Sequence, residues 1–179
     1  MKLNVRSPLL ELSSRLNKIC FQDSVKLKLT NANCTSLNPS WVRMKQCRLK
    51  AINRHRTVLN FNATFLKPTR DIWAKYRMFK RENGYKPWLI NLDIDCCQFL
   101  RKPYNGVGII VYNMYRNFSN VNHTCPLYGD ILIQGMYLRT EVLRLPFPTG
   151  YFMIATTWSF YEKPQFQVNV SFEFTEDLI

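Results

Sequence analysis

The chain has 179 residues, of which 46% are hydrophobic and 14% aromatic, and its formal net charge at pH 7 is +13. This composition excludes a wholly disordered chain, and the length favours a single domain, since domains average about 150 residues. No stretch approaches the about 20 consecutive apolar residues of a membrane-spanning helix, which excludes one. The positive charge is uneven, because residues 43–86 hold thirteen Lys and Arg against two acidic residues. Such an excess is typical of binding to nucleic acid, an anionic membrane or an acidic partner, and also of a solvated basic face.

Residues 1–24 form an atypical N-terminal segment. They contain no apolar run of about 7–15 residues, so they do not match a secretory signal peptide. Between Pro8 and Cys20, four apolar residues recur at helical spacing, and this stretch is predicted to be a short amphipathic helix or disordered. The remainder, residues 25–179, is predicted to form one domain.

Apolar and polar residues alternate through most of that remainder, and this period of two indicates half-buried β-strands. The clearest case is the last segment, where Phe and Val alternate with Gln, Asn, Ser and Glu. In the segment 88–97, Trp88, Ile90, Leu92, Ile94 and Cys96 are expected to share one strand face. In chain order, strands are predicted at 24–33, 41–52, 59–65, 71–80, 88–97, 130–138, 152–160 and 165–174.

Only residues 105–118 break the alternation. Val107, Ile110, Val111 and Met114 recur there at helical spacing, which predicts one short helix. Asn83-Gly84 is the strongest hairpin signal between the strands. About eight short strands with one helix indicate an all-β, antiparallel sandwich or barrel.

Six cysteines are more than a typical cytosolic domain carries, and they favour an oxidising compartment. They stand at Cys20, Cys34, Cys47, Cys96, Cys97 and Cys125. Neither C-x-x-C nor H-x-x-x-H spacing occurs, and the sequence has only two histidines, so we expect no metal site.

The disulfide connectivity does not follow from the sequence, because six cysteines allow fifteen full pairings. Adjacent cysteines on an extended strand point to opposite faces, so Cys96 and Cys97 should have different partners. We expect bridges between Cys34 and Cys47 and between Cys97 and Cys125. That choice leaves Cys20 and Cys96 either free or paired together.

Five Asn-x-Ser/Thr sequons occur, against about two expected by chance, and this excess also favours the secretory pathway. The sequons at Asn33 and Asn122 lie beside cysteines, so folding competes with their use. The candidate glycosylation sites are Asn62, Asn117, Asn122 and Asn169.

Four ordered motifs resemble those of a large insect family of secreted domains. KRENGYKPWLIN at 80–91 resembles the family signature KR.NGYKPFLYN, and LDIDCCQFL at 92–100 resembles VDxCKFL. SNVNHTCP at 119–126 is similar to SNINHTCPY, and LPFPTG at 145–150 to LPFPEGDY. The acidic residue expected after Gly150 is missing from this chain. The resemblance covers roughly residues 25–175.

The best described members of that family are insect chemosensory proteins related to ganglioside-activator and ML-type lipid-recognition sandwiches. The resemblance therefore implies an immunoglobulin-like, ML-type sandwich of two antiparallel sheets over 25–179. It also implies a secreted, non-enzymatic carrier of a lipid or other apolar ligand, in chemosensation of the pheromone or cuticular-lipid type. The family pattern includes Cys34, Cys47, Cys97 and Cys125, whereas Cys20 and Cys96 are departures from it.

A sandwich that does not close tightly leaves an apolar pocket between its sheets. Inward-facing strand residues are the candidates for its lining, with one helix residue at the entrance, although ordinary core packing explains the strand residues equally well. These candidates are Phe61, Phe65, Trp88, Ile90, Leu92, Met114, Phe152, Ile154, Trp158, Val168, Val170 and Phe172.

Three other functions remain as alternatives. The first is a basic extracellular module that recognises an anionic membrane, a glycan or a receptor through the cations between Arg43 and Lys86. Nucleic-acid binding lacks a recognised motif, so no nucleic-acid partner is expected. For an enzyme, His55, His123 and the pair Asp93 and Asp95 accompany no catalytic motif, so we expect neither catalytic residues nor a cofactor.

Overall fold

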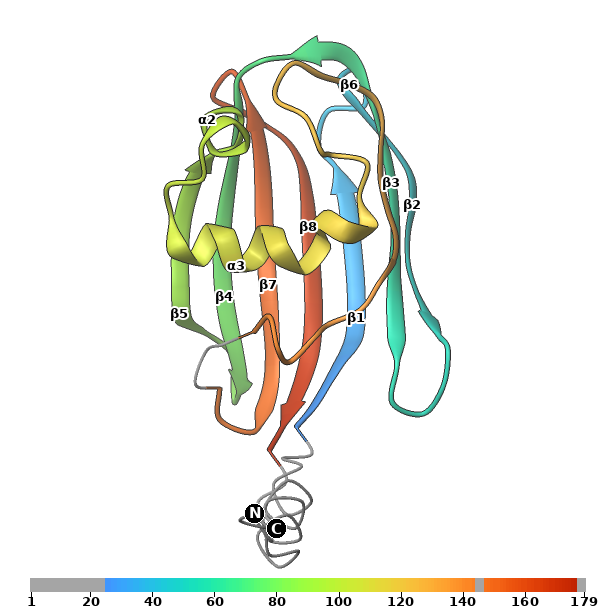
Figure 1. Cartoon of the computed structure of the whole chain (residues 1–179), viewed down its shortest axis with the longest axis vertical. Coiled ribbons are helices and arrows are strands. Elements are labelled where there is room, and N and C mark those ends of the chain that lie inside the picture. Colours follow the sequence, from blue (N-terminus) through green and yellow to red (C-terminus); the bar gives the residue numbers. More distant parts are fainter. Residues whose placement is uncertain (1–24, 144–146, 177–179) are drawn as a thin grey trace, which may run out of the picture.

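Alternating apolar and polar residues give each long strand one buried face and one solvated face. The computed structural model describes residues 25–143 and 147–176, which fold into two antiparallel sheets packed face to face (Figure 1). The larger sheet has the strand order β1-β8-β7-β4-β5 and the smaller one the order β2-β3-β6. The predicted all-β sandwich of two antiparallel sheets and about eight strands is confirmed.

The eight predicted strands all form, each within a few residues of its expected bounds. They are β1 (Lys26–Ser36), β2 (Val42–Ala51), β3 (Thr57–Thr69), β4 (Ile72–Glu82), β5 (Gly84–Asp95), β6 (Leu127–Met136), β7 (Gly150–Phe160) and β8 (Lys163–Thr175).

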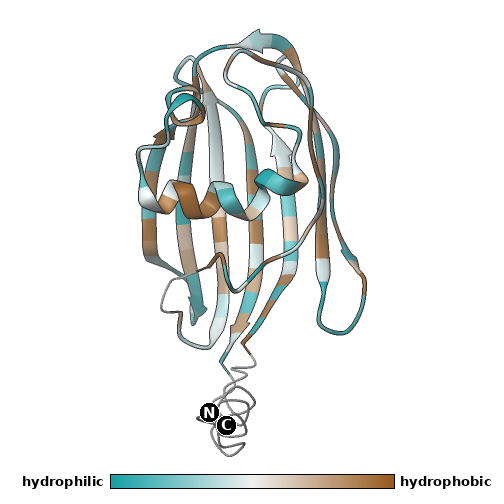
Figure 2. Ribbon diagram, in the orientation of Figure 1, coloured by the Kyte–Doolittle hydropathy of each residue, from teal (hydrophilic) through white to brown (hydrophobic). Residues whose placement is uncertain are grey.

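The core lies between the sheets and is rich in aromatic rings. On β3, Phe61 and Phe65 are buried, whereas the intervening Asn62 is on the outer face, and bands of opposite hydropathy follow one another along the strands (Figure 2). The ring of Phe65 lies 5.0 Å from that of Phe160 and 5.9 Å from that of Phe166, centroid to centroid. Such contacts between β3 and the β7–β8 pair bind the two sheets together.

Two helices and a 3-10 turn cover the part of the larger sheet that the smaller one does not reach. They are α2 (Cys96–Arg101), α3 (Gly106–Tyr115) and η1 (Arg116–Phe118). Figure 1 shows α3 running across the strands of the larger sheet. The Asn105 side chain begins α3 by accepting a hydrogen bond from the Gly108 N–H at 2.9 Å. The predicted helix at 105–118 is thus confirmed, and α2 was not predicted.

The prediction that residues 88–97 form one strand is wrong at its end. The strand stops at Asp95, whose carboxylate accepts a hydrogen bond from the Gln98 N–H at 3.0 Å and caps α2. Cys96 and Cys97 therefore stand in the first turn of a helix, and both are buried. They nevertheless differ in bonding, because Cys97 is in a disulfide and Cys96 is a free thiol.

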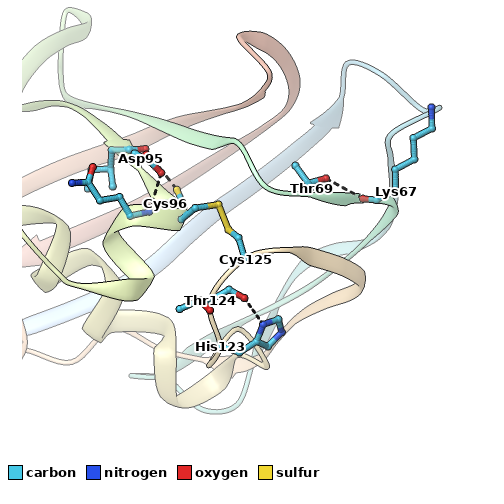
Figure 3. Close-up of a disulfide and its surroundings, with 10 residues drawn as sticks. Lys67, Thr69, Asp95, Cys96, His123, Thr124 and Cys125 are labelled. Carbon is cyan, nitrogen blue, oxygen red and sulfur yellow. Dashed lines mark hydrogen bonds between the residues drawn. A yellow bond between two sulfur atoms is a disulfide. The ribbon is translucent and has the colours of Figure 1, made fainter.

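Both expected disulfides are present, and each closes a different side of the sandwich. Cys34–Cys47 joins β1 to β2, which are the edge strands of the two sheets on one side. Cys97–Cys125 joins α2, which follows edge strand β5, to the segment before edge strand β6 (Figure 3). One bridge thus links the sheets directly, and the other fixes the helices between the two remaining edges.

The predicted helix or disorder over residues 1–24, including Cys20, lies outside the described residues. Among the helices within 25–143 and 147–176, none has the length and apolar character needed to cross a bilayer.

Replacing Cys97 and Cys125 together by Ser should lower the free energy of unfolding by about 3 kcal/mol, because the bridge restricts the unfolded chain. Hydrogen exchange should also become faster in α2 and α3, since the bridge holds α2 in place. The matched control is the double Cys34→Ser, Cys47→Ser variant, which should lose similar stability but leave exchange in α3 unchanged. Urea unfolding and exchange mass spectrometry measure both effects, and equal acceleration of α3 in the two variants would contradict this account.

Candidate functional site

A cavity of about 210 Å³ lies between the inner face of the larger sheet and the helices that cover it. Its wall includes residues of β4, β7 and β8 from the larger sheet and of β3 and β6 from the smaller sheet. On the open side of the sandwich the wall is completed by α2 and α3, with Phe99 and Val111 as examples. The cavity exists because helices do not fill the space between the sheets as completely as interdigitated strands would.

The helix α3 approaches the larger sheet closely at one glycine. A Cβ atom on Gly108 would lie 2.5 Å from Ile94 Cδ1 and 3.1 Å from Phe99 Cε2. A side chain there would force Ile94 or α3 to move. Gly108 therefore allows the helix to pack on β5 while the cavity stays open further along.

Nine of the twelve residues that the sequence offered as pocket candidates line this cavity. They are Phe61, Phe65, Ile90, Met114, Ile154, Trp158, Val168, Val170 and Phe172.

The other three candidates, Trp88, Leu92 and Phe152, do not line it. The ring centroid of Trp88 lies 5.1 Å from that of Phe147 and 4.9 Å from that of Phe152. These three rings form an aromatic cluster beside the cavity, and only Phe147 of the three lines it. Leu92 packs at the periphery of the core. Alternation placed Trp88 and Leu92 on the more buried face of β5, but it does not distinguish residues that line the cavity from those packed beside it.

Sequence reasoning missed the lining residues that lie outside regular strands. Phe99 and Leu100 come from α2, and Val121, Leu138 and Leu143 come from the irregular segments that flank β6. Short helices and loops have no clear period, so no sequence pattern identified these residues as inward-facing.

Four lining residues on the inner faces of β4, β7, α2 and α3 carry polar groups. Tyr76 on β4 interacts with Tyr115 on α3 through a hydrogen bond between their side chains, and Cys96 lies near both. The fourth is Thr156 on β7, which is paired with Tyr76 in the antiparallel register. Tyr76, Thr156 and Cys96 are all buried.

Burial keeps these groups neutral. Desolvation is the main cause that raises the pKa of both tyrosine hydroxyls well above the ordinary value. It also raises the pKa of the Cys96 thiol to about 12, with a smaller contribution from the charge of Asp95. A thiol in this state is a poor nucleophile, because the thiolate is the reactive form.

The described lining contains no Asp, Glu, Lys, Arg or His residue. The groups weighed above for catalysis lie elsewhere: His55 is exposed in the loop after β2, and the Nδ1 atom of His123 lies 2.8 Å from the Thr124 carbonyl oxygen (Figure 3). Asp93 forms an ion pair with Arg77 at 2.7 Å. No cluster of three or more His, Cys, Asp or Glu side chains suited to a metal ion occurs within the described ranges. The described lining of the cavity is therefore apolar apart from hydroxyl and thiol groups.

The cations between Arg43 and Lys86 do not form one surface. A β-bulge at Lys45, where Met44 pairs with Ala63 and Gln46 with Asn62, reverses the alternation of β2. Four cations consequently lie along the exposed side of β2, at Arg43, Lys45, Arg48 and Lys50.

The cations of β4 belong to the other sheet, so Lys75 and Arg77 face away from those of β2. Several of these charges are also paired, as in the Lys45–Asp130 contact at 2.8 Å. Hydrogen bonds from Lys45 and Thr64 hold the pKa of Asp130 below its usual value. The charge excess is thus divided between opposite faces.

Comparisons with known proteins find a matching family and a similar solved structure. Residues 74–154 match the model of a family described as "Protein of unknown function (DUF1091)", and this stretch runs from β4 into β7 and includes both helices. Among solved structures, the chain is similar to a Niemann-Pick type C2 protein from Japanese carpenter ant. The identity is 11% and the TM-score 0.32, over 84% of this chain and 93% of that one. A search of curated proteins finds no match.

The raised pKa of Cys96 predicts a pH dependence of stability. In the folded state the thiol titrates near 12, whereas in the unfolded state it titrates near 9.0, so the unfolded state gains a favourable ionisation between these values. The stability that the neutral Cys96 thiol gives to the folded state is complete below about pH 9 and is lost as the pH rises towards 12. Tyr76 and Tyr115 also lower the stability of the folded state as the pH rises further, because burial raises their pKa values too.

In Cys96→Ala, the loss of unfolding free energy with pH should be less steep, by up to about 1.4 kcal/mol per pH unit in this window. Urea unfolding of the variant and the wild type at a series of pH values measures this slope. Parallel profiles would show that the thiol is not protonated preferentially in the folded state.

Proposed function

We propose that the protein is a non-enzymatic carrier that holds a lipid or another apolar small molecule between its sheets. The observation that carries this proposal is a cavity of about 210 Å³ whose described lining has no ionisable Asp, Glu, Lys, Arg or His side chain. By comparison, an engineered protein cavity of about 150 Å³ lined by Leu, Ile and Phe stays dry and binds benzene.

The energetics favour occupation of such a space. At about 24 cal/mol per Å³, an empty cavity of 210 Å³ costs about 5 kcal/mol of folding free energy. Each methylene group that moves from water into it contributes about 0.8 kcal/mol. A chain of several methylenes therefore gains affinity from its own burial and relieves the cost of the void.

We further propose that the protein acts outside the cell. Two disulfides support this location, because such bridges persist in oxidising compartments. Three of the sequons, at Asn33, Asn117 and Asn122, are exposed, and of these Asn117 and Asn122 are the candidates for glycosylation. A role in insect chemosensation rests on the motif resemblance at 80–91, 92–100, 119–126 and 145–150.

A second candidate function is docking on an anionic surface, which the bulge at Lys45 favours by aligning four cations on β2. The two functions are compatible, since a carrier loads its ligand from a membrane or a receptor. Binding to anionic vesicles should fall steeply as salt rises from about 0.05 to 0.5 M, because the charges are exposed. Binding that does not change with salt would exclude this candidate.

Filling the cavity should abolish ligand binding without unfolding the protein. In Val170→Phe, the larger ring would enter the space between β8 and α3, so the fluorescent probe N-phenylnaphthylamine should bind at least about tenfold more weakly. A fluorescence titration of the delipidated protein measures the affinity, and the melting temperature should stay within a few degrees of the wild type.

The matched control is Leu92→Phe, which adds the same ring to the same sheet at a position that does not line the cavity. It should bind the probe as the wild type does. Wild-type protein that binds no apolar probe, or equal loss of binding in both variants, would contradict the proposal.

When the chain is secreted from insect cells, glycans should be found at Asn117 and Asn122 and not at Asn62. Asn117 and Asn122 are exposed, whereas Asn62 lies in the central strand of the smaller sheet with its side-chain oxygen buried. Asn169 on β8 is half-buried and should also stay unmodified. Peptide mapping before and after glycosidase treatment tests this, and a glycan at Asn62 with an unmodified Asn117 would contradict it.

A further inference from the structure

Part of the cavity wall is polar, in contrast to the rest. Tyr76, Tyr115 and Thr156 come from β4, α3 and β7, and all three line the cavity. The side chains of Tyr76 and Thr156 lie on the same face of the larger sheet at directly paired positions, and the hydroxyl of Tyr76 bonds to that of Tyr115. We call these three residues the hydroxyl cluster.

The hydroxyl cluster has hydrogen-bonding capacity that the described protein does not use. Each hydroxyl has one proton to donate and two lone pairs to accept with. The bond between Tyr76 and Tyr115 uses one of the two tyrosine protons, so the other is left to donate elsewhere. Apart from the bond between Tyr76 and Tyr115, these hydroxyls form no hydrogen bond within residues 25–143 and 147–176. None of the three is a fully buried atom without a partner, so each has either a partner or open space beside it.

A polar group in an apolar cavity is costly when it lacks a partner, by about 1–3 kcal/mol for a hydroxyl. The cluster is therefore best satisfied when the occupant of the cavity brings a hydrogen-bonding group of its own. The same two tyrosines remain protonated, since burial raises their pKa, and so they act as donors over the whole physiological pH range.

The group has to be neutral. A carboxylate would lose its water without gaining a cation, because the described lining has no Lys, Arg or His. A hydroxyl or carbonyl oxygen loses much less on desolvation and accepts a hydrogen bond from a tyrosine O–H. The rest of the ligand would lie against the apolar wall formed by residues such as Val168 and Phe172.

We propose that the cavity selects an alkyl molecule with one neutral hydroxyl or carbonyl group, which binds at the hydroxyl cluster of Tyr76, Tyr115 and Thr156. Selection acts against both the plain hydrocarbon and the carboxylate of the same chain length. This inference rests on the proposed function as an apolar carrier, and it names the chemical class of the ligand.

The test compares dodecanol, dodecane and dodecanoate as competitors for N-phenylnaphthylamine bound to the delipidated protein. Dodecanol should displace the probe at about a tenfold lower concentration than either of the other two, as expected for one or two added hydrogen bonds. In the double variant Tyr115→Phe, Thr156→Val, the advantage of dodecanol over dodecane should fall to about twofold or less.

The matched control is Tyr137→Phe, which removes one tyrosine hydroxyl from a half-buried residue that does not line the cavity. This variant should keep the full preference for dodecanol. Circular dichroism and melting temperatures of the variants establish that they fold as the wild type does.

The outcomes separate this inference from the proposed function. If all three competitors bind wild-type protein with equal affinity, the protein is a carrier but the hydroxyl cluster does not select the ligand, and the inference is overturned. Loss of the preference in Tyr137→Phe as much as in the double variant would also overturn it. If the probe and all competitors fail to bind, the proposed function itself fails.

Discussion

The inner face of a five-stranded sheet is wider than the three-stranded sheet that packs on it, so part of its apolar surface has to be covered by other elements. In this protein, α2 and α3 provide that cover, and Cys97–Cys125 ties them to the segment before β6. A helix that lies across a twisted sheet contacts it over only part of its length, and Gly108 marks the point of closest approach. The cavity is the space that remains beyond this contact. The packing of α2 and α3 on the larger sheet thus both completes the fold and forms the cavity.

Much of this architecture could be predicted from the sequence, because burial on one face imposes a period of two on each strand. Eleven of the twelve pocket candidates follow from that rule and Met114 from helical spacing, and nine of the twelve line the cavity. The rule fails where the backbone departs from regular pairing. It predicts that the strand continues through Cys96, whereas the carboxylate of Asp95 caps a helix that begins at Cys96. It also could not foresee the bulge at Lys45, since pairing register depends on two strands rather than one.

The polar part of the site lay beyond sequence reasoning for a different reason. Tyr76 sits on an alternating strand and Tyr115 on a helix, and nothing in either pattern indicates that their hydroxyl groups meet. Their contact depends on how α3 crosses the larger sheet. A protein that needed only a stable core would gain by replacing these hydroxyls with apolar groups, since buried polar groups cost free energy unless they are satisfied. The hydroxyl cluster is explained if the cavity is a binding site and the ligand completes its hydrogen bonds.

The most direct measurement is a crystal structure of the delipidated protein grown in the presence of dodecanol. The account predicts density for an alkyl chain between α3 and the inner face of β7 and β8, with its oxygen within about 3 Å of a hydroxyl of Tyr76, Tyr115 or Thr156. A structure in which side chains have collapsed into this space, with the alcohol absent or bound elsewhere on the surface, would contradict it.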